Sequence, residues 1–179
     1  MKPLCWSLGA DCANEAWHQL KKFSPQGSRT MYYGEVLSGP KIPIELAKAS
    51  ISRAFETLGQ HGYKVINQNR AHYTSVNLTV ACGNIGIHAD DGLGRVALIL
   101  LRVNPLSRSK GCQFMDSPYE TENYLWTRHG LSSVEEGDMV VFDTDQEHGW
   151  FCPGVATFLS LVVRKHKKAQ IGGILSRVV

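Results

Sequence analysis

Hydrophobic positions recur with a helical period in two segments of the N-terminal third of the chain. Between residues 44 and 58, apolar side chains return every three or four positions, and the glycines that follow supply a stop. The sequence therefore predicts one helix over 44–58. A shorter helix is predicted over residues 12–22, where Trp17 and Leu20 fall on one face and polar groups fill the other.

Beyond Gly62 the pattern changes to short runs that alternate between apolar and polar residues or are continuously apolar. Such runs, separated by glycine-containing turns, predict strands. They lie at residues 73–81, 96–103, 113–115, 139–142 and 157–163. Many short strands after a helical N-terminal part favour an α+β fold. We expect a mostly antiparallel jelly-roll core of the double-stranded β-helix type, with the helical portion packed outside it.

Length and composition limit the classes of protein to consider. At 179 residues the chain has the size of one ordinary domain, which can bury a core without disulfides or structural zinc. Hydrophobic residues make up 43% and charged residues 20%, which excludes a mainly disordered chain. No apolar run approaches the roughly 18 to 20 residues of a membrane span, and no secretion signal is visible. We therefore expect no membrane partner.

The cysteine count indicates the cellular compartment, and the charge distribution bears on whether the protein binds nucleic acid. Five cysteines, odd in number and without a C-x-x-C pair, favour reduced thiols in an intracellular, cytoplasmic protein. The net charge of +3 is too small to identify a binder of polyanions. Basic side chains are nevertheless concentrated in residues 164–168. This run either forms a solvated tail or contacts nucleic acid phosphates, and the sequence leaves both open.

His88, Asp90 and His148 form a candidate metal site. Residues two apart in an extended segment point to the same face, so His88 and Asp90 converge. His148 comes from a distant segment beside another predicted strand and adds a second imidazole. Two histidines and one carboxylate occupy one face of an ion and leave its other positions open, as in non-haem Fe(II) oxygenases. Taken singly, either segment could instead be a polar surface loop.

Five motifs between residues 28 and 165 follow one another in an order that resembles a known enzyme family. They are Ser28-Arg-Thr-Met-Tyr-Tyr-Gly34, Asn77-Leu-Thr79, Gly83-Asn-Ile-Gly-Ile-His-Ala-Asp-Asp91, Glu136-Gly-Asp-Met-Val-Val-Phe142 and Phe158-Leu-Ser-Leu-Val-Val-Arg164. In this order they resemble the AlkB-like family of Fe(II)- and 2-oxoglutarate-dependent dioxygenases, which remove alkyl groups from nucleic acid bases. The resemblance implies an arm with a short helix (1–27), a dioxygenase domain (28–168) and a C-terminal tail (169–179).

The resemblance also implies the reactants and the residues that hold them. His88, Asp90 and His148 would be the iron ligands, and the reaction would use Fe(II), 2-oxoglutarate and dioxygen. Asn77 matches the residue that hydrogen-bonds 2-oxoglutarate. Arg164 matches the second arginine of the last motif, Phe158–Arg164. The planar guanidinium of an arginine can bind a carboxylate through two hydrogen bonds.

Two positions of the cosubstrate site depart from the family pattern. Thr79 stands where the family has a tyrosine, and it keeps a hydroxyl with a shorter reach. Phe158 stands in place of the arginine that holds the distal carboxylate of 2-oxoglutarate. Arg102, on the strand that follows the metal motif, is the best substitute for that arginine, and Arg95 is a weaker one.

The same resemblance suggests how a substrate base would be held. Tyr32 and Tyr33 match the family's lid motif and would stack on a flipped or unpaired base, although ordinary strand packing explains them equally well. Asp91 is a candidate contact to the base. Trp126 and His129 could line the rim, but an ordinary polar loop is the simpler interpretation.

The predicted function is oxidative demethylation of N-alkylated bases in single-stranded RNA or DNA, with RNA favoured. We expect the chain to act as a monomeric domain, which a larger polypeptide could contain. Two alternatives stay open at this point. One is an oxygenase of the same fold that hydroxylates a protein or a small molecule. The other is a non-catalytic binding module, for which the substitution at Phe158 is the main argument.

Overall fold

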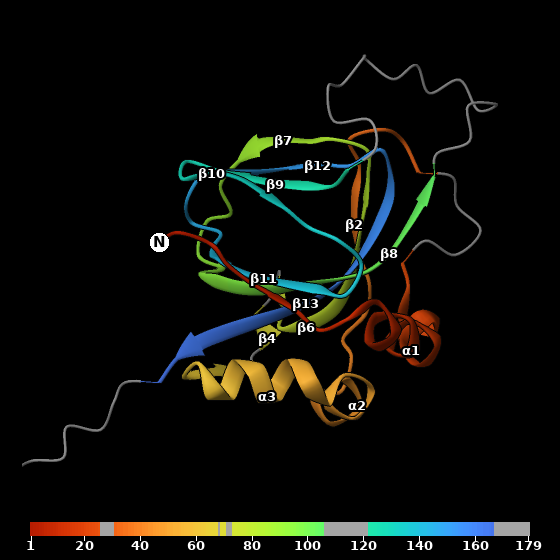
Figure 1. Cartoon of the computed structure of the whole chain (residues 1–179), viewed down its shortest axis with the longest axis vertical. Coiled ribbons are helices and arrows are strands. Elements are labelled where there is room, and N and C mark those ends of the chain that lie inside the picture. Colours follow the sequence, from red (N-terminus) through yellow and green to blue (C-terminus); the bar gives the residue numbers. More distant parts are fainter. Residues whose placement is uncertain (26–30, 68, 71–72, 106–121, 167–179) are drawn as a thin grey trace, which may run out of the picture.

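The computed structural model describes residues 1–25, 31–67, 69–70, 73–105 and 122–166, and Figure 1 shows the arrangement of their elements. A small antiparallel sheet faces a large one, and the helices cover the outer side of the large sheet. The strand predicted at residues 113–115 and the tail predicted at 169–179 lie outside the described residues. The α+β jelly-roll architecture predicted from the sequence is confirmed.

The large sheet has seven strands, all of whose pairs are antiparallel, in the order β1-β11-β8-β13-β6-β2, with β3 paired to β13. Their bounds are β1 Leu4–Ser7, β11 Asp138–Asp143, β8 Arg95–Pro105, β13 Gly154–Lys165, β6 Val76–Cys82, β2 Val36–Ser38 and β3 Tyr63–Val65. The long central strands β8 and β13 are buried on both faces, which explains their almost continuous apolar sequence.

The small sheet has the order β10-β9-β12-β7. Its strands are β10 Gly130–Ser133, β9 Tyr124–Thr127, β12 His148–Phe151 and β7 Ile85–His88. A separate hairpin consists of β4 Asn69–Arg70 and β5 Tyr73–Thr74. None of the small-sheet strands was predicted, because each is short and several carry glycine or polar residues.

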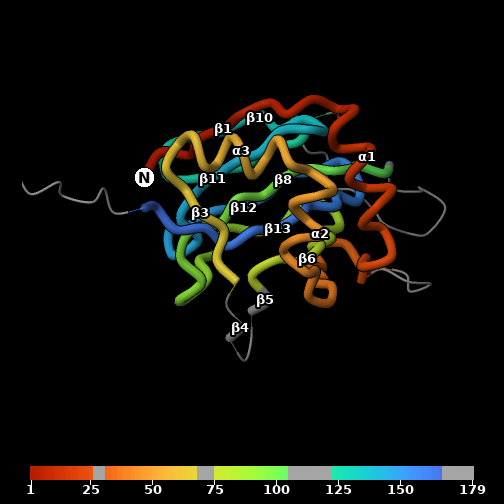
Figure 2. Tube along the Cα trace, turned by 90° about the horizontal axis from the view of Figure 1, so that it is seen from below, coloured from red at the N-terminus to blue at the C-terminus, as the bar shows by residue number. Residues whose placement is uncertain are grey.

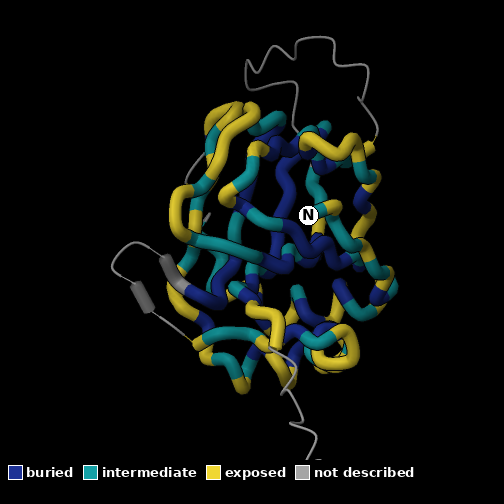
Figure 3. Tube along the Cα trace, turned by 90° about the vertical axis from the view of Figure 1, so that its left-hand side faces the viewer, coloured by how far each residue is buried: buried dark blue, intermediate teal, exposed yellow. Residues whose placement is uncertain are grey.

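The large sheet separates two hydrophobic cores because its side chains alternate between its faces. Odd-numbered residues of β8 and β13, such as Ile99 and Leu161, pack under the helices. Even-numbered residues, such as Leu100 and Phe158, enter the core between the two sheets. Figure 3 shows buried segments in the middle of the molecule and exposed segments at its periphery.

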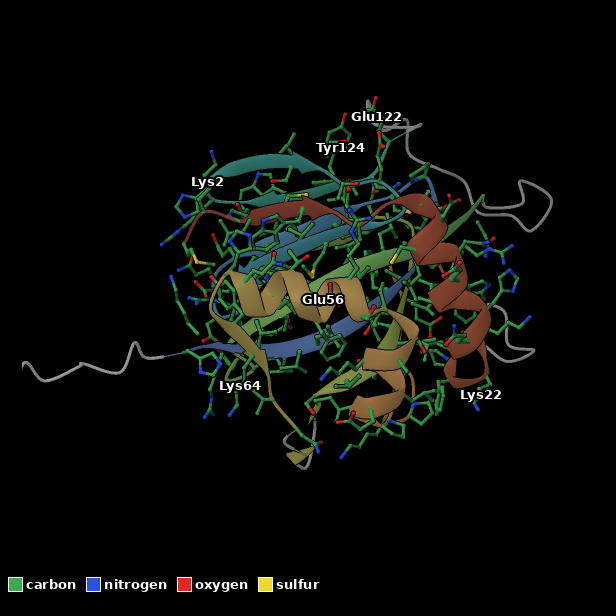
Figure 4. The ribbon with its side chains drawn as sticks, turned by 60° about the horizontal axis from the view of Figure 1, so that its bottom comes forward. Lys2, Lys22, Glu56, Lys64, Glu122 and Tyr124 are labelled. Carbon is green, nitrogen blue, oxygen red and sulfur yellow. The ribbon has the colours of Figure 1, made fainter. Side chains whose placement is uncertain are left out.

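The helices on the outer face are α1 (Ala10–Leu20), α2 (Ile44–Ser50) and α3 (Ser52–Gln60), and a 3-10 turn follows α1 at Lys21–Phe23. Figure 2 shows α3 lying across the strands of the large sheet. In Figure 4, Lys22, Glu56 and Lys64 extend away from this layer. Among the described residues, no helix is long and apolar enough to cross a membrane.

The single helix predicted over 44–58 is wrong in one respect, because two helices meet there. Ile51 leaves the helical conformation, with φ −147° and ψ 57°, and is only 1% exposed. The kink lets Ala47 and Leu58, on different helices, both reach the core against the sheet. An apolar periodicity that continues through a kink does not reveal it.

The N-terminal segment is an integral part of the domain, rather than an arm outside it. Its strand β1 pairs with β11 over Leu4–Ser7 and extends the large sheet. The helix predicted over 12–22 is present, and Leu20 on its apolar face is fully buried. The backbone N–H of Leu8 donates to the Gly137 carbonyl at 2.8 Å, which connects this segment to the turn before β11.

Candidate metal centre and cavity

His88, Asp90 and His148 come together at one end of the space between the two sheets. Nε2 of His88 lies 3.6 Å from one carboxylate oxygen of Asp90, and Nε2 of His148 lies 3.6 Å from the other. The imidazole centroids are 4.4 Å apart. One ligand atom from each residue lies within 4.8 Å of the other two, so the three side chains predicted as metal ligands form a compact cluster.

Antiparallel pairing places the two histidines side by side. His148 on β12 is directly opposite His88 on β7. Two residues further along β12, Trp150 is opposite Ile85, so β7 contains one extra residue in this stretch. This β-bulge lets Ile85 and His88 both face the cavity, while Ile87 turns outward and is 54% exposed. The bulge is therefore what points His88 at the metal site.

Backbone carbonyls orient both imidazoles. Nδ1 of His88 lies 2.7 Å from the Gly86 carbonyl oxygen, and Nδ1 of His148 lies 2.9 Å from that of Gln146. A ring that donates its Nδ1–H to a carbonyl keeps the Nε2 lone pair free for a metal. Both Nε2 atoms face Asp90, so each ring points in the direction that metal binding requires.

The Asp90 carboxylate is held in its ionised form. Its backbone N–H donates to the Thr144 carbonyl at 2.8 Å, which fixes the segment after β7 against the end of β11. The nearby His148 imidazole holds the pKa of Asp90 below its ordinary value, against the opposing effect of burial. Burial works to lower the pKa of His148, but its interactions with Asp90 and the Gln146 carbonyl raise that pKa above its usual value. Because metal binding requires a neutral imidazole, a metal and a proton would compete for His148.

A cavity of about 360 Å³ extends from the metal cluster between the sheets. The His88 side chain is 43% exposed and that of Asp90 34%, whereas His148 is only 9% exposed. The cluster thus lies at an accessible end of the cavity. Its described lining is apolar or neutral apart from the metal cluster, and consists of Val36, Ser38, Asn77, Thr79, Ala81, Ile85, Leu93, Val96, Leu98, Leu125, Phe142, Thr144, Gly149, Trp150, Phe158, Ser160 and Val162.

Asn77 and Thr79, predicted to contact the cosubstrate, both line this cavity from β6. Asn77 is 6% exposed and lies opposite Ser160 on β13. Its amide forms no side-chain hydrogen bond to any residue within the described ranges, although buried amides normally have a partner. A buried amide at a cavity wall, with no side-chain partner among the described residues, is suited to binding a polar ligand.

Arg102 lies on the opposite side of the large sheet from the cavity. The pairing of β8 with β13 shifts by one residue at Leu101, and this bulge reverses the faces of the residues that follow. The Arg102 guanidinium is 5.6 Å from the ring centroid of Trp17 on α1, and its Nε donates to Asn104 at 2.8 Å. The structure therefore does not bring Arg102 to the position that the Phe158 substitution leaves without a cation.

The other two candidate arginines are also outside the cavity lining. Arg164 continues the row of Ser160 and Val162 on β13, at the metal end of the strand, and is exposed. Arg95 faces the helix side, where its Nε donates to Asp143 at 2.8 Å and its guanidinium lies over the ring of Tyr63. A carboxylate role for Arg164 stays a prediction.

The predicted substrate-binding residues lie around the cavity without lining it. Tyr32 is 72% exposed and Tyr33 38% exposed, in the turn before β2. The ring of Tyr33 packs so closely on Gly83 that a Cβ there would lie 2.2 Å from it, and Gly83 has a φ of +70°. Asp91 is exposed, one residue beyond the metal ligand Asp90. Their contacts with a substrate stay predictions.

Several residues of the cavity wall were not predicted from the sequence. The polar loop proposed for Trp126 is wrong, because Trp126 lies in β9 (Tyr124–Thr127). At the start of this strand, the Tyr124 hydroxyl donates to the Glu122 carboxylate. Figure 4 labels both residues at the upper edge of the molecule. Leu125 of β9, Trp150 of β12 and the short edge strand β2 contribute to the wall, whereas Trp126 does not line it. β2 has only three residues, Val36–Ser38, which are too few for a hydrophobic pattern to predict a strand.

Comparison with known proteins confirms the fold. No protein-family model and no curated protein matches the chain. Among solved structures, a prolyl hydroxylase from Trichoplax adhaerens, in complex with a peptide fragment of the hypoxia inducible factor oxygen degradation domain, is similar with a TM-score of 0.51. It is 14% identical, and the match covers 89% of this chain and 83% of that one. The chain has the double-stranded β-helix fold.

A prolyl-4-hydroxylase from Pseudomonas putida matches with a TM-score of 0.49 and 12% identity, over 92% of this chain and 93% of that one. Prolyl hydroxylases are oxygenases with a double-stranded β-helix that use Fe(II), 2-oxoglutarate and dioxygen. At such low identity, the structural similarity to the Trichoplax adhaerens protein shows the fold of the present chain and nothing finer. It does not transfer the peptide substrate of the similar protein.

The donor set fits iron(II). Two imidazole nitrogens and one carboxylate are the donors of the facial arrangement that leaves positions free on the ion. The mutual distances allow one ion to contact all three, and the orienting carbonyls are in place. The cavity beside the cluster gives a ligand access to the free positions. Its described lining offers neutral polar groups, rather than a basic side chain, to such a ligand.

Proposed function

We propose that the protein is an Fe(II)- and 2-oxoglutarate-dependent dioxygenase. The observation that carries this proposal is the cluster of His88, Asp90 and His148 at the accessible end of the cavity in a double-stranded β-helix. When bound, iron with 2-oxoglutarate and dioxygen supplies the oxidising power for attack on an unactivated C–H bond.

The residues of this chain would perform four tasks. His88 and His148 bind the ion through Nε2, and the two carbonyls behind them keep both rings in position. Asp90 contributes negative charge, which favours a cation in the site. Asn77 donates to a bound carboxylate or oxo group from the wall. The apolar side chains around them exclude water from the reaction.

For the substrate, we propose N-methylated bases in single-stranded RNA or DNA. The motif order from Ser28 to Arg164 supports this class, and residues 28–30 of it lie outside the described residues. The exposed aromatic pair Tyr32 and Tyr33 stands just before β2, whose Val36 and Ser38 form part of the cavity wall. Exposed rings at a cavity edge suit stacking on an unpaired base.

Hydroxylation of an N-methyl group gives a hemiaminal, which breaks its C–N bond and releases formaldehyde with the unmodified base. A base inside a duplex cannot reach a cavity of this size, so the substrate must be unpaired or flipped. Asp91, exposed beside the metal cluster, is a proposed contact to the base. We further propose that the protein acts as a monomer in the cytoplasm, where reduced thiols are stable.

Mass spectrometry of methylated oligonucleotides tests this function directly. Single-stranded RNA and DNA that carry different N-methylated bases are incubated with the protein, Fe(II), 2-oxoglutarate and ascorbate. Loss of one methylene mass is the expected result, and the oligonucleotide that shows it identifies the base.

The test needs one inactive variant and one matched control. His88→Ala removes a metal ligand and should abolish demethylation. His18→Ala changes an exposed histidine on α1, far from the cluster in sequence and on the outer helix layer, and should leave activity unchanged. Succinate formation without demethylation would overturn the nucleic acid substrate, and a gain of one oxygen atom on proline-containing peptides would then identify a peptide hydroxylase. Absence of both products would overturn the enzyme class.

A further inference from the structure

The inner part of the cavity is built around Phe158 instead of a charged group. Phe158 is 3% exposed and packs edge-on against Trp150, with ring centroids 4.7 Å apart. On the large sheet it lies between Thr79 and Leu100, its partners on the neighbouring strands. Ser38 on β2 is in turn the partner of Thr79. These four cross-strand neighbours form a row across the sheet, with the hydroxyls of Ser38 and Thr79 beside the apolar side chains of Phe158 and Leu100.

No lysine or arginine lines the cavity among the residues that the structure describes. Arg95 is paired with Asp143 on the helix side, and Arg102 lies over Trp17 on the same side. Arg164 is on the cavity face of β13, but six residues from Phe158, which is about 20 Å along a strand. None of these three cations can approach Phe158.

The position of this row determines which part of a ligand it contacts. Trp150 is two residues from the metal ligand His148 on β12, about 7 Å along the strand. A linear 2-oxo acid held at the metal by its oxo-acid end would direct its tail toward Trp150 and Phe158. For 2-oxoglutarate this tail ends in a second carboxylate, and for a monocarboxylic 2-oxo acid it ends in a methyl group.

The free-energy cost of removing a carboxylate from water must be offset by hydrogen bonds or by a nearby cation, and this row supplies only neutral hydrogen-bond donors. Neutral hydroxyl and amide donors give hydrogen bonds about half as strong as those from a cation. The Phe158 ring and the Trp150 indole replace water around the carboxylate and offer no counter-charge, which raises its desolvation cost. The Trp150 Nε1–H, buried with no partner among the described residues, adds one more neutral donor and no charge. The same rings favour an apolar tail, because burial of each methylene is favourable.

We infer that Phe158 determines cosubstrate selectivity, and that the site accepts 2-oxo acids with uncharged tails at least as well as 2-oxoglutarate. This inference rests on the proposed function, because it assumes that a 2-oxo acid binds beside the metal. 2-Oxoglutarate remains a cosubstrate, but its second carboxylate contributes little to its affinity. The protein would consequently couple its oxidation to the decarboxylation of more than one 2-oxo acid.

Binding measurements test this without reference to turnover. The whole chain, loaded with Fe(II) under anaerobic conditions, is titrated with 2-oxoglutarate and with 2-oxopentanoate, which has the same five-carbon chain and no second carboxylate. The visible absorbance that appears when a 2-oxo acid chelates Fe(II) reports each Kd, and calorimetry with the Mn(II)-loaded protein provides a second measurement. We expect the two acids to bind within about threefold of each other, or 2-oxopentanoate to bind more tightly.

A variant reverses the predicted selectivity. Phe158→Arg introduces the missing cation and should shift the affinity ratio toward 2-oxoglutarate by at least about tenfold, as one charge-assisted hydrogen bond permits. Phe158→Leu keeps the row apolar and should not shift it. If Phe158→Arg does not fold, which circular dichroism shows, the wild-type ratio alone decides the question.

Two failures can be distinguished. Wild-type protein that binds 2-oxoglutarate at least tenfold more tightly than 2-oxopentanoate would overturn this inference and leave the proposed function intact. Protein that binds Fe(II) but neither acid, or no metal at all, would overturn the proposed function and this inference with it.

Discussion

Asp90 and Asp91 are adjacent carboxylates with different surroundings. Asp90 has a carboxylate oxygen 3.6 Å from Nε2 of each imidazole and belongs to the metal cluster, while Asp91 is exposed and outside it. His-x-Asp spacing explains the choice between them, since only Asp90 shares a face with His88. This pair of residues provides a matched test of the metal site.

Asp90→Asn should weaken metal binding by at least about 100-fold, because a neutral amide replaces the anionic ligand while the side-chain shape is kept. In wild type, a divalent metal at 100 times its Kd should raise the free energy of unfolding by about 2.7 kcal/mol, or roughly 5–10 °C in Tm. Thermal melts with and without Mn(II) measure this. Asp91→Asn should keep the full shift, and an Asp90→Asn protein that also keeps it would contradict the assignment.

At the scale of elements, turns and bulges determine which side chains reach the site. The bulge in β7 points His88 into the cavity, and the shift at Leu101 removes Arg102 from it. The turn before β11 is equally specific. Gly137 has a φ of +94°, and a Cβ there would lie 2.4 Å from the backbone of Gly9. This glycine lets the start of α1 pack against the end of the β10–β11 connection.

Gly137→Ala should therefore destabilise the protein by about 2–4 kcal/mol, because the strain of a positive φ at alanine is added to the cost of the Cβ clash with the Gly9 backbone. Gly59→Ala in α3 is the matched control. A Cβ at Gly59 meets nothing within 4 Å, and alanine is the better helix former, so this change should be neutral or stabilising by about 0.5 kcal/mol. Urea unfolding measures both. Equal effects of the two substitutions would show that the Gly9–Gly137 approach does not matter.

At the scale of the molecule, the large sheet carries one core on each face, and the N-terminal segment closes the outer one. Leu8 is 1% exposed and packs with residues of α1, α3 and the large sheet. β1 occupies the edge next to β11, so the first strand in sequence completes a sheet built mainly from the second half of the chain. Stability of the metal-binding domain should therefore depend on this segment.

Leu8→Ala should lower the free energy of unfolding by about 2–5 kcal/mol, the cost of a large cavity in a packed core. Leu131→Ala, at a residue that is 44% exposed on β10, should change it by less than about 0.5 kcal/mol. Chemical denaturation followed by tryptophan fluorescence compares them. A Leu8→Ala protein as stable as wild type would mean that residues 1–27 are an arm after all.

The sequence by itself determined the features that depend on local chemistry. Alternating and apolar runs located β6, β8, β11 and β13, since a strand's side-chain period is two in any fold. The His88-Ala-Asp90 spacing and a distant His148 identified the ligand set, because the donor types and the shared face are properties of the residues themselves. The apolar face of α1 was equally readable from Trp17 and Leu20.

Only the tertiary structure decided which face later residues occupy and which distant segments pair. One extra residue in a strand reverses every side chain after it, and nothing in the composition of β8 marks the shift that turns Arg102 toward Trp17. The kink at Ile51 depends on packing two helices against one sheet. Short strands such as β1 and β2 exist because a neighbouring strand supplies their hydrogen bonds. Pairing partners and register are long-range properties, so only the folded molecule showed that no described lysine or arginine lines the cavity around Phe158.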